Sequence, residues 1–143
     1  MIRLATKEEL KHIENDPVRP HLKTDWRTRS GREVYVLERE GEIAAVICVA
    51  FMDEVPQSEY DMRWPGMSHA IFYTVWSYQK GAGRQIINQA QMHLHKKFGN
   101  KIKKYVTLSP LTRVAERFHL RNGAILLQKG EKCQNFEYSL PKE

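Results

Sequence analysis

Residues 70–84 constrain this chain more than any other stretch, because they combine the signals of a strand, a glycine turn and a helix start. Residues 70–76 are rich in β-branched and aromatic side chains, which suit a buried strand. Gly81 and Gly83 follow, and apolar side chains at intervals of three and four then predict a helix that ends near Phe98. The sequence thus predicts a strand, a tight turn and a long helix in immediate succession.

A Gly-x-Gly turn ahead of a helix has two interpretations. Glycines let the backbone pass close to a ligand, and the helix start offers unpaired N–H groups and a positive dipole end to a phosphate. Alternatively, the glycines only give the turn its shape. The spacing of Gly81 and Gly83 does not decide between these interpretations.

Length and composition indicate one globular domain over residues 1–143, since 41% hydrophobic and 28% charged residues are ordinary proportions. No apolar run approaches the roughly 20 residues that span a bilayer. The N-terminus becomes charged too early for a secretory signal, and two cysteines build no disulfide framework. We therefore expect a cytoplasmic protein with no membrane partner.

The net charge of +6 favours an anionic partner, either nucleic acid or a phosphorylated small molecule. The basic residues are spread along the chain, and the densest run, residues 101–104, is short. Nucleic acid is therefore not the expected partner. No metal site is expected either, because His93 and His95 would point to different faces of the predicted helix.

The predicted elements form a mixed sheet flanked by helices, an α/β (α+β) arrangement with one parallel crossover made by the long helix. In chain order they are a helix from Thr6, strands 34–37 and 43–51 as a hairpin, a loop 52–65, strand 70–76, helix 82–98, strand 105–108 stopped by Ser109 and Pro110, helix 112–121, and strands 124–127 and 136–140. Ligands of such sheets bind at the carboxyl ends of the parallel strands. Here those ends lie at the glycine turn and at Ser109.

This order, with a glycine loop opening the long helix, resembles the GNAT acyltransferase superfamily, whose loop reads Gln/Arg-x-x-Gly-x-Gly/Ala. Gly81 and Gly83 fit, while Tyr78 occupies the first position and Gln79 lies one place further on. The resemblance implies a mixed, mostly antiparallel GNAT-like sheet. It also implies a small-molecule acyl-coenzyme A thioester as the ligand, with no further cofactor.

The resemblance further implies which residues hold coenzyme A. Its pyrophosphate would bind the loop, where the amides receive added charge from Lys80 and Arg84, and its pantetheine arm would pair with strand backbone. The implied residues are Gln79, Lys80, Gly81, Ala82, Gly83 and Arg84 for the loop, and Phe72, Tyr73 and Thr74 for the strand.

A narrower resemblance links the chain to the catalytic domain of malonyl-CoA decarboxylase, which has a GNAT fold. It rests on residues 70–73 (Ala-Ile-Phe-Tyr), 107–110 (Thr-Leu-Ser-Pro) and 118–124 (Phe-His-Leu-Arg-Asn-Gly-Ala). The family also has a large helical domain and a glutamate in its glycine loop. Neither has a counterpart in this sequence.

This second resemblance implies three catalytic residues. His119 would protonate the α-carbon or bond the carboxylate, Ser109 would hydrogen-bond the carboxylate, and Tyr138 would donate to the thioester or the carboxylate. Each also has an ordinary structural interpretation. These are a buried histidine on an apolar helix face, a Ser turn before proline, and a strand tyrosine.

The implied function is decarboxylation of malonyl-CoA to acetyl-CoA and CO₂ by a His/Ser pair. The alternative is an acetyl-CoA-dependent N-acetyltransferase, which is the commoner activity of the fold. A third class is a non-catalytic acyl-CoA-binding or basic nucleic-acid-associated protein. The sequence leaves the oligomeric state open, a homo-oligomer included.

Overall fold

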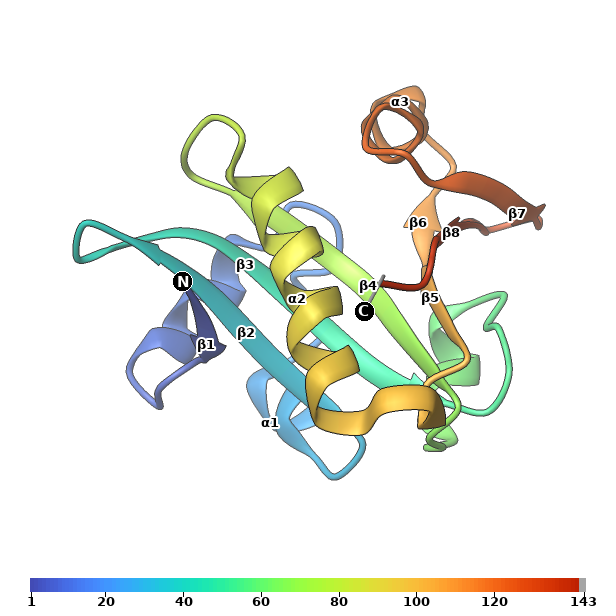
Figure 1. Cartoon of the computed structure of the whole chain (residues 1–143), viewed down its shortest axis with the longest axis horizontal. Helices are drawn as coiled ribbons and strands as arrows, with labels where there is room; N and C mark the ends of the chain where they lie inside the picture. The colour runs from blue at the N-terminus through green and yellow to red at the C-terminus, as the bar shows by residue number, and fades with distance from the viewer. Residues whose placement is uncertain (142–143) are drawn as a thin grey trace.

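The computed structural model describes residues 1–141, and its elements follow the predicted order with few additions (Figure 1). In chain order they are β1 (Ile2–Leu4), the 3-10 helix η1 (Glu9–Asn15), α1 (Thr24–Thr28), β2 (Arg32–Arg39), β3 (Glu42–Met52), the 3-10 helix η2 (Glu59–Arg63), β4 (His69–Ser77), α2 (Ala82–Phe98), the 3-10 turn η3 (Gly99–Lys101), β5 (Lys104–Thr107), β6 (Ser109–Pro110), α3 (Arg113–Arg121), β7 (Ile125–Lys129) and β8 (Cys133–Tyr138).

The strands form one mixed sheet in the order β1-β2-β3-β4-β5-β8-β6, and β7 pairs with β8 outside this path. β4 and β5 run parallel, and the other pairs are antiparallel. α2 connects the parallel pair, which confirms the predicted crossover. The fold class is therefore the predicted one, a mostly antiparallel sheet flanked by helices.

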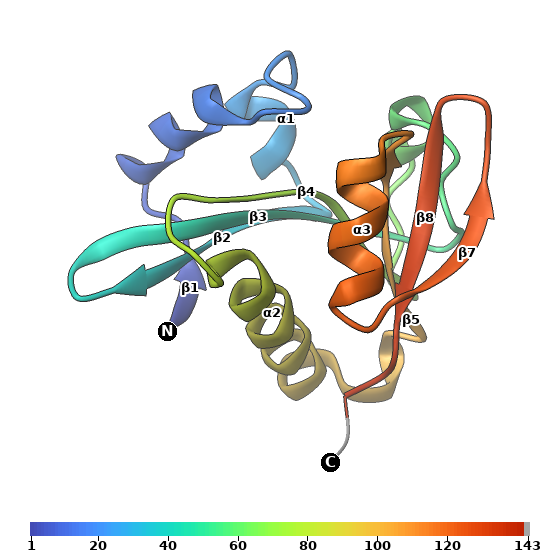
Figure 2. The same cartoon turned by 90° about the horizontal axis from the view of Figure 1, so that it is seen from above.

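β3 lies inside the sheet, and its side chains from Ala44 to Met52 are buried. α2 covers one face of the sheet, where Ile86, Ile87 and Leu94 pack into the core. The N-terminal segment with η1 and α1 covers the opposite face, as Figure 2 shows. The uninterrupted apolar sequence of β3 follows from this burial on both faces.

The structure differs from the sequence-based predictions at several short elements. The helix predicted from Thr6 is the 3-10 helix η1, which begins at Glu9, and α1 and η3 are additions. β1 was not predicted, because a strand of three residues gives no periodic signal. Ser109 and Pro110 do not simply stop a strand, since they form β6 and pair with Gln134 and Cys133 of β8. Proline suits this place because β6 is the last strand in the sheet order and needs no further donor. The predicted loop 52–65 contains η2.

The last two strands are also shifted from their predicted limits. β8 begins three residues before the predicted start at residue 136 and ends two residues before the predicted end at residue 140. β7 extends to Lys129. Tight antiparallel pairing between the two strands sets these limits, including a register shift between Leu126 and Gln128. Gln134 and Asn135 are buried in this pairing. Because they are polar, the sequence predicted a turn at these residues instead of the start of the strand.

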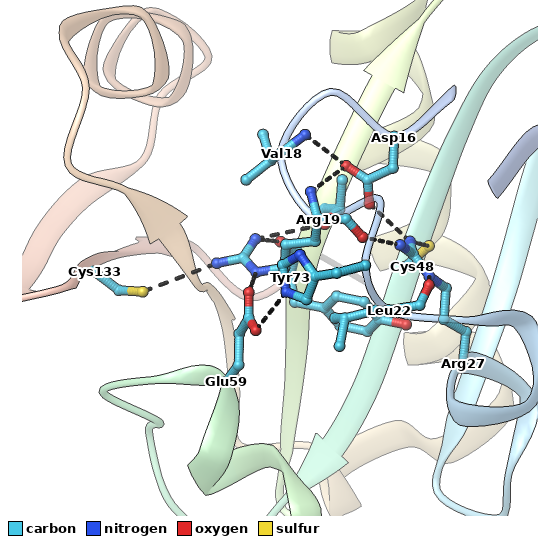
Figure 3. A network of polar contacts seen from close by, with 11 residues as sticks. Asp16, Val18, Arg19, Leu22, Arg27, Cys48, Glu59, Tyr73 and Cys133 are labelled. Atoms are coloured by element: carbon cyan, nitrogen blue, oxygen red, sulfur yellow. Dashed lines mark hydrogen bonds and ion pairs between the residues drawn. The ribbon is translucent and has the colours of Figure 1, made fainter. Parts of the chain in front are cut away.

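A buried ion pair organises the segment between η1 and α1. Arg27 donates to Asp16 at 2.8 Å, and both side chains are fully inaccessible to solvent. The second oxygen of Asp16 accepts the backbone N–H groups of Val18 and Arg19, each at 2.8 Å. Asp16 therefore fixes the turn formed by residues 16–19, which Figure 3 shows beside β4.

Replacing Asp16→Asn should destabilise the protein by about 3 kcal/mol or more, because the charge of Arg27 then lacks its buried partner. Urea unfolding at pH 7 measures this cost. The matched control is Lys104→Met, which removes an exposed pair with Glu137 at 3.5 Å and should cost at most about 1 kcal/mol. Equal costs for the two variants would contradict the assigned role of the buried pair.

Candidate functional site

A cavity opens where β4 and β5 part. Their parallel pairing ends at Phe72 and Thr107. One residue further, Tyr73 forms a bulge, since Phe72 pairs with Val49 and Thr74 pairs with the adjacent Cys48. The chain after β5 then turns into β6, which pairs with β8. The second half of β4 is thus left without a strand partner on this side among the described residues.

The cavity has a volume of about 400 Å³, and its walls come from five segments. These are residues 17–19, the second half of β4, the start of α2, residues 108–110 and α3. No Asp or Glu is found among the described residues that line it, whereas Arg19 and Arg121 are. The lining therefore favours an anionic over a cationic ligand.

His119 lines this cavity from α3 and is only 6% exposed. Its Nδ1 lies 2.7 Å from the hydroxyl of Tyr138, and its ring stacks on Phe136 with centroids 5.3 Å apart. Tyr138 stands behind His119 on β8 and does not itself line the cavity. The structure thus joins two of the three predicted catalytic residues in one hydrogen bond.

Burial sets the protonation state of this pair. It lowers the pKa of His119 to about 4, so that the imidazole is neutral at pH 7. Burial also raises the pKa of Tyr138, which keeps the phenol protonated. A protonated phenol beside a neutral imidazole favours donation from Tyr138 to Nδ1 of His119. In that tautomer Nε2 of His119 carries the proton and has no acceptor within residues 1–141, so it is available to a ligand.

Ser109 lines the same cavity and is also buried. Its hydroxyl lies 2.7 Å from the hydroxyl of Thr107, which also accepts the backbone N–H of Phe136 at 3.0 Å. Either hydroxyl can donate within the pair. When Thr107 donates, the Ser109 hydroxyl keeps its own proton for a ligand in the cavity.

The two glycines of the loop have distinct structural roles. Gly81 precedes α2 with a φ of 76°, a left-handed conformation that glycine adopts without strain. Gly83 lies inside the helix, where a Cβ would come within 3.1 Å of the Phe118 ring on α3. The glycines therefore shape the turn and let α3 pack against α2. Within residues 1–141 no side chain caps the α2 N-terminus, so its first amides are also suited to an anion.

Most of the predicted loop residues lie outside the cavity. Gly83 lines it, whereas Gln79, Lys80, Gly81, Ala82 and Arg84 do not. Lys80 and Arg84 are exposed beside the helix start, where they add positive charge. Arg39 of β2 holds the loop by donating to the Lys80 carbonyl at 3.3 Å and to Gln79 at 3.4 Å.

Phe72, Tyr73 and Thr74 all line the cavity, but two of their carbonyl groups are already bonded. The Phe72 carbonyl accepts the Leu108 N–H at 3.2 Å, and the Tyr73 carbonyl accepts a hydrogen bond from Arg19. Strand-like pairing with an extended ligand is therefore left to the backbone from Thr74 onward.

The sequence does not indicate the contacts of two residues, Arg19 in the cavity wall and Tyr78 in the loop before α2. Arg19 lies in a polar stretch of the sequence that carries no motif, and only its contacts identify it. Tyr78, at the first position of the glycine-loop pattern, is 44% exposed. Its hydroxyl contacts His12 and Asn15 of η1 at 3.0 Å each, so it ties the loop to the N-terminal segment. A tyrosine between a strand and a glycine turn gave no signal of this contact.

The lowered pKa of His119 predicts a pH-dependent stability. The folded value of about 4 lies below the ordinary value near 6.5, so the stabilisation is complete above pH 6.5 and is lost as the pH falls to 4. Between pH 7.5 and 4.5 the protein should lose about 2.5 kcal/mol more stability than a His119→Gln variant, measured by urea unfolding. Equal losses of stability in the two proteins would show that burial does not lower the pKa of His119.

Comparison with known proteins supports the fold and does not extend to a family. No protein-family model matches the chain, and no curated protein matches it.

No helix in the part of the chain that the structure describes is long and apolar enough to cross a membrane.

Solved structures of low sequence identity superpose well on this chain. A malonyl-CoA decarboxylase from Cupriavidus metallidurans has a TM-score of 0.58 at 21% identity over 84% of this chain, and the chain spans 33% of that protein's length. A GNAT acetyltransferase from Elizabethkingia anophelis with acetyl-CoA bound has a TM-score of 0.61 at 12% identity, covering 96% of this chain and 94% of its own. The ribosomal-protein-S18-alanine N-acetyltransferase of Escherichia coli has a TM-score of 0.64 at 13% identity, covering 96% and 89%. The chain therefore has the fold of the GNAT acyltransferases.

Proposed function

We propose that this chain binds an acyl-CoA thioester and acts on its acyl group. The uncapped N-terminus of α2 suits the pyrophosphate, and Lys80 and Arg84 lie exposed beside it. The cavity between β4 and α3 lies next to this helix start, since Gly83 is part of its wall. A structure of the same fold with acetyl-CoA bound supports this class of ligand.

The solved structures support acetyl transfer to an amine more broadly than decarboxylation. The two acetyltransferases described above cover nearly the whole of this chain and of their own chains. The decarboxylase has the higher identity, but this chain spans only a third of it. Acetyl transfer to an amine is therefore the alternative to decarboxylation that has to be tested.

The charges of the cavity favour decarboxylation of malonyl-CoA over acetyl transfer. We therefore propose decarboxylation as the reaction. An amine substrate arrives as an ammonium ion and needs a base, yet the described lining contains no carboxylate. His119 is a weak base at pH 7, because its pKa is lowered to about 4. The carboxylate of a malonyl group instead meets arginine and hydroxyl donors.

In the proposed reaction the bond from the α-carbon to the carboxylate breaks, CO₂ leaves, and the electron pair forms the enolate of the acetyl thioester. Ser109 would hold the carboxylate, and Nε2–H of His119 would stabilise the enolate oxygen. The α-carbon then takes a proton from Nε2 while the Tyr138 proton moves to Nδ1, along the 2.7 Å contact. A solvent proton then returns to Nε2 while Nδ1 gives its proton back to Tyr138, so that the pair is restored and one proton is consumed for each CO₂ released.

The reaction is tested by incubating the purified protein with malonyl-CoA alone and measuring acetyl-CoA by mass spectrometry. A parallel reaction contains acetyl-CoA and a panel of amines. We expect acetyl-CoA to form from malonyl-CoA without an acceptor. Acetylated amine with no product from malonyl-CoA alone would replace decarboxylation by acetyl transfer. Failure to bind any coenzyme A thioester would overturn the whole proposal.

Variants then test the assigned residues. His119→Gln should lower kcat by roughly 10²- to 10⁴-fold, and Ser109→Ala by roughly tenfold or more. The matched control is His93→Gln, which changes a half-buried histidine on α2 outside the cavity and should retain full kcat. Unaltered kcat in both cavity variants, with thermal unfolding like that of the parent protein, would remove the proposed roles.

A further inference from the structure

Arg19 lies at the cavity wall in a position fixed by a chain of buried contacts (Figure 3). Arg27 holds Asp16, and Asp16 accepts the backbone N–H of Arg19 at 2.8 Å. Arg27 also donates to the Arg19 carbonyl. The backbone of Arg19 is therefore anchored on both sides, and its side chain extends toward β4 and β8.

The guanidinium of Arg19 bridges the opening between the strands. Its Nη1 donates to the Tyr73 carbonyl at the β4 bulge, with the Thr74 hydroxyl at 3.5 Å. Its Nε donates to Glu59 of η2 at 2.9 Å. Its Nη2 lies 3.9 Å from Sγ of Cys133 on β8. The side chain is only 3% exposed, so its charge is desolvated.

These contacts leave donor capacity on Nη2. A guanidinium has five N–H groups, and a thiol is a weak acceptor. The contacts of Nε and Nη1 occupy three N–H groups, and Cys133 engages one of the two on Nη2. The remaining Nη2–H has no acceptor within residues 1–141. It can therefore bind a ligand in the cavity.

The free donor belongs to the same cavity wall as Ser109, the predicted carboxylate-binding residue. Cys133, which contacts Nη2, pairs with Pro110 of β6, directly after Ser109. Arg19 and Ser109 both line the cavity, so their donors can meet on one ligand group. Glu59, the carboxylate partner of Arg19, is not in the lining. Arg121 lines the cavity too but is exposed, and solvent weakens its attraction for an anion.

We propose that Arg19 is a specificity-determining residue that recognises a carboxylate on the acyl group of the thioester. The cavity would then prefer short dicarboxylic acyl thioesters, such as malonyl-CoA, over uncharged ones such as acetyl-CoA. A charge-assisted hydrogen bond in a desolvated site supplies the discrimination. This inference rests on the proposed acyl-CoA binding, whichever reaction follows.

The test compares the affinities for malonyl-CoA and acetyl-CoA by calorimetry, in a His119→Gln background that slows turnover. We expect malonyl-CoA to bind roughly tenfold or more tightly, and Arg19→Gln to abolish this ratio while acetyl-CoA affinity stays within about threefold. The matched control is Arg117→Gln on α3, an exposed arginine outside the cavity, which should keep the ratio.

A second variant tests the inference in case Arg19→Gln does not fold. Glu59→Gln removes the neutralising partner of the guanidinium, lies nearer the surface, and should raise the malonyl-to-acetyl ratio by about threefold. The inference is overturned by equal affinities in the parent protein, or by an unchanged ratio in Arg19→Gln. Where Arg19→Gln does not fold, an unchanged ratio in Glu59→Gln overturns it instead. Binding of neither thioester would contradict the proposed function itself.

Discussion

The end of the pairing between β4 and β5 is the constraint on which the site depends. Hydrogen bonding stops at Phe72 and Thr107, and the bulge at Tyr73 leaves the rest of β4 open on that side. A continued parallel ladder would fill this space with backbone. Because β5 turns into β6, Ser109 instead faces a cavity that His119 enters from α3.

The N-terminal segment connects stability to this cavity. The buried pair of Asp16 and Arg27 is costly to form and more costly to break, since each charge depends on the other. The pair fixes the position of Arg19, because Asp16 binds the turn that contains this residue. The guanidinium of Arg19 then holds the bulged carbonyl of Tyr73, so one buried network sets both the open strand and the charge beside it.

The fold was largely predictable because its main signals are local. The periodic change from strand to helix across residues 70–98 predicted β4, α2 and the crossover. β1 and β6 were missed, because elements of two or three residues exist only through their partners. Neither short strand has a pattern of its own.

The site was predictable only where a resemblance existed. It placed Ser109 and His119, which the structure brings to one cavity, while their roles stay predictions. Arg19 lay in a polar segment with several other arginines. Only tertiary contacts show that Arg19 is buried and anchored at the cavity wall, and no spacing in the sequence encodes those contacts.

A crystal structure with a non-reactive malonyl-CoA analogue would show directly whether the acyl group binds in the cavity between β4 and α3. We expect pyrophosphate density at the amides that open α2, and acyl density between β4 and α3. We also expect the carboxylate within hydrogen-bond distance of Ser109 and Nη2 of Arg19, with Nε2 of His119 facing the thioester. An analogue whose acyl group lies outside this cavity, in a well-ordered complex, would contradict the account.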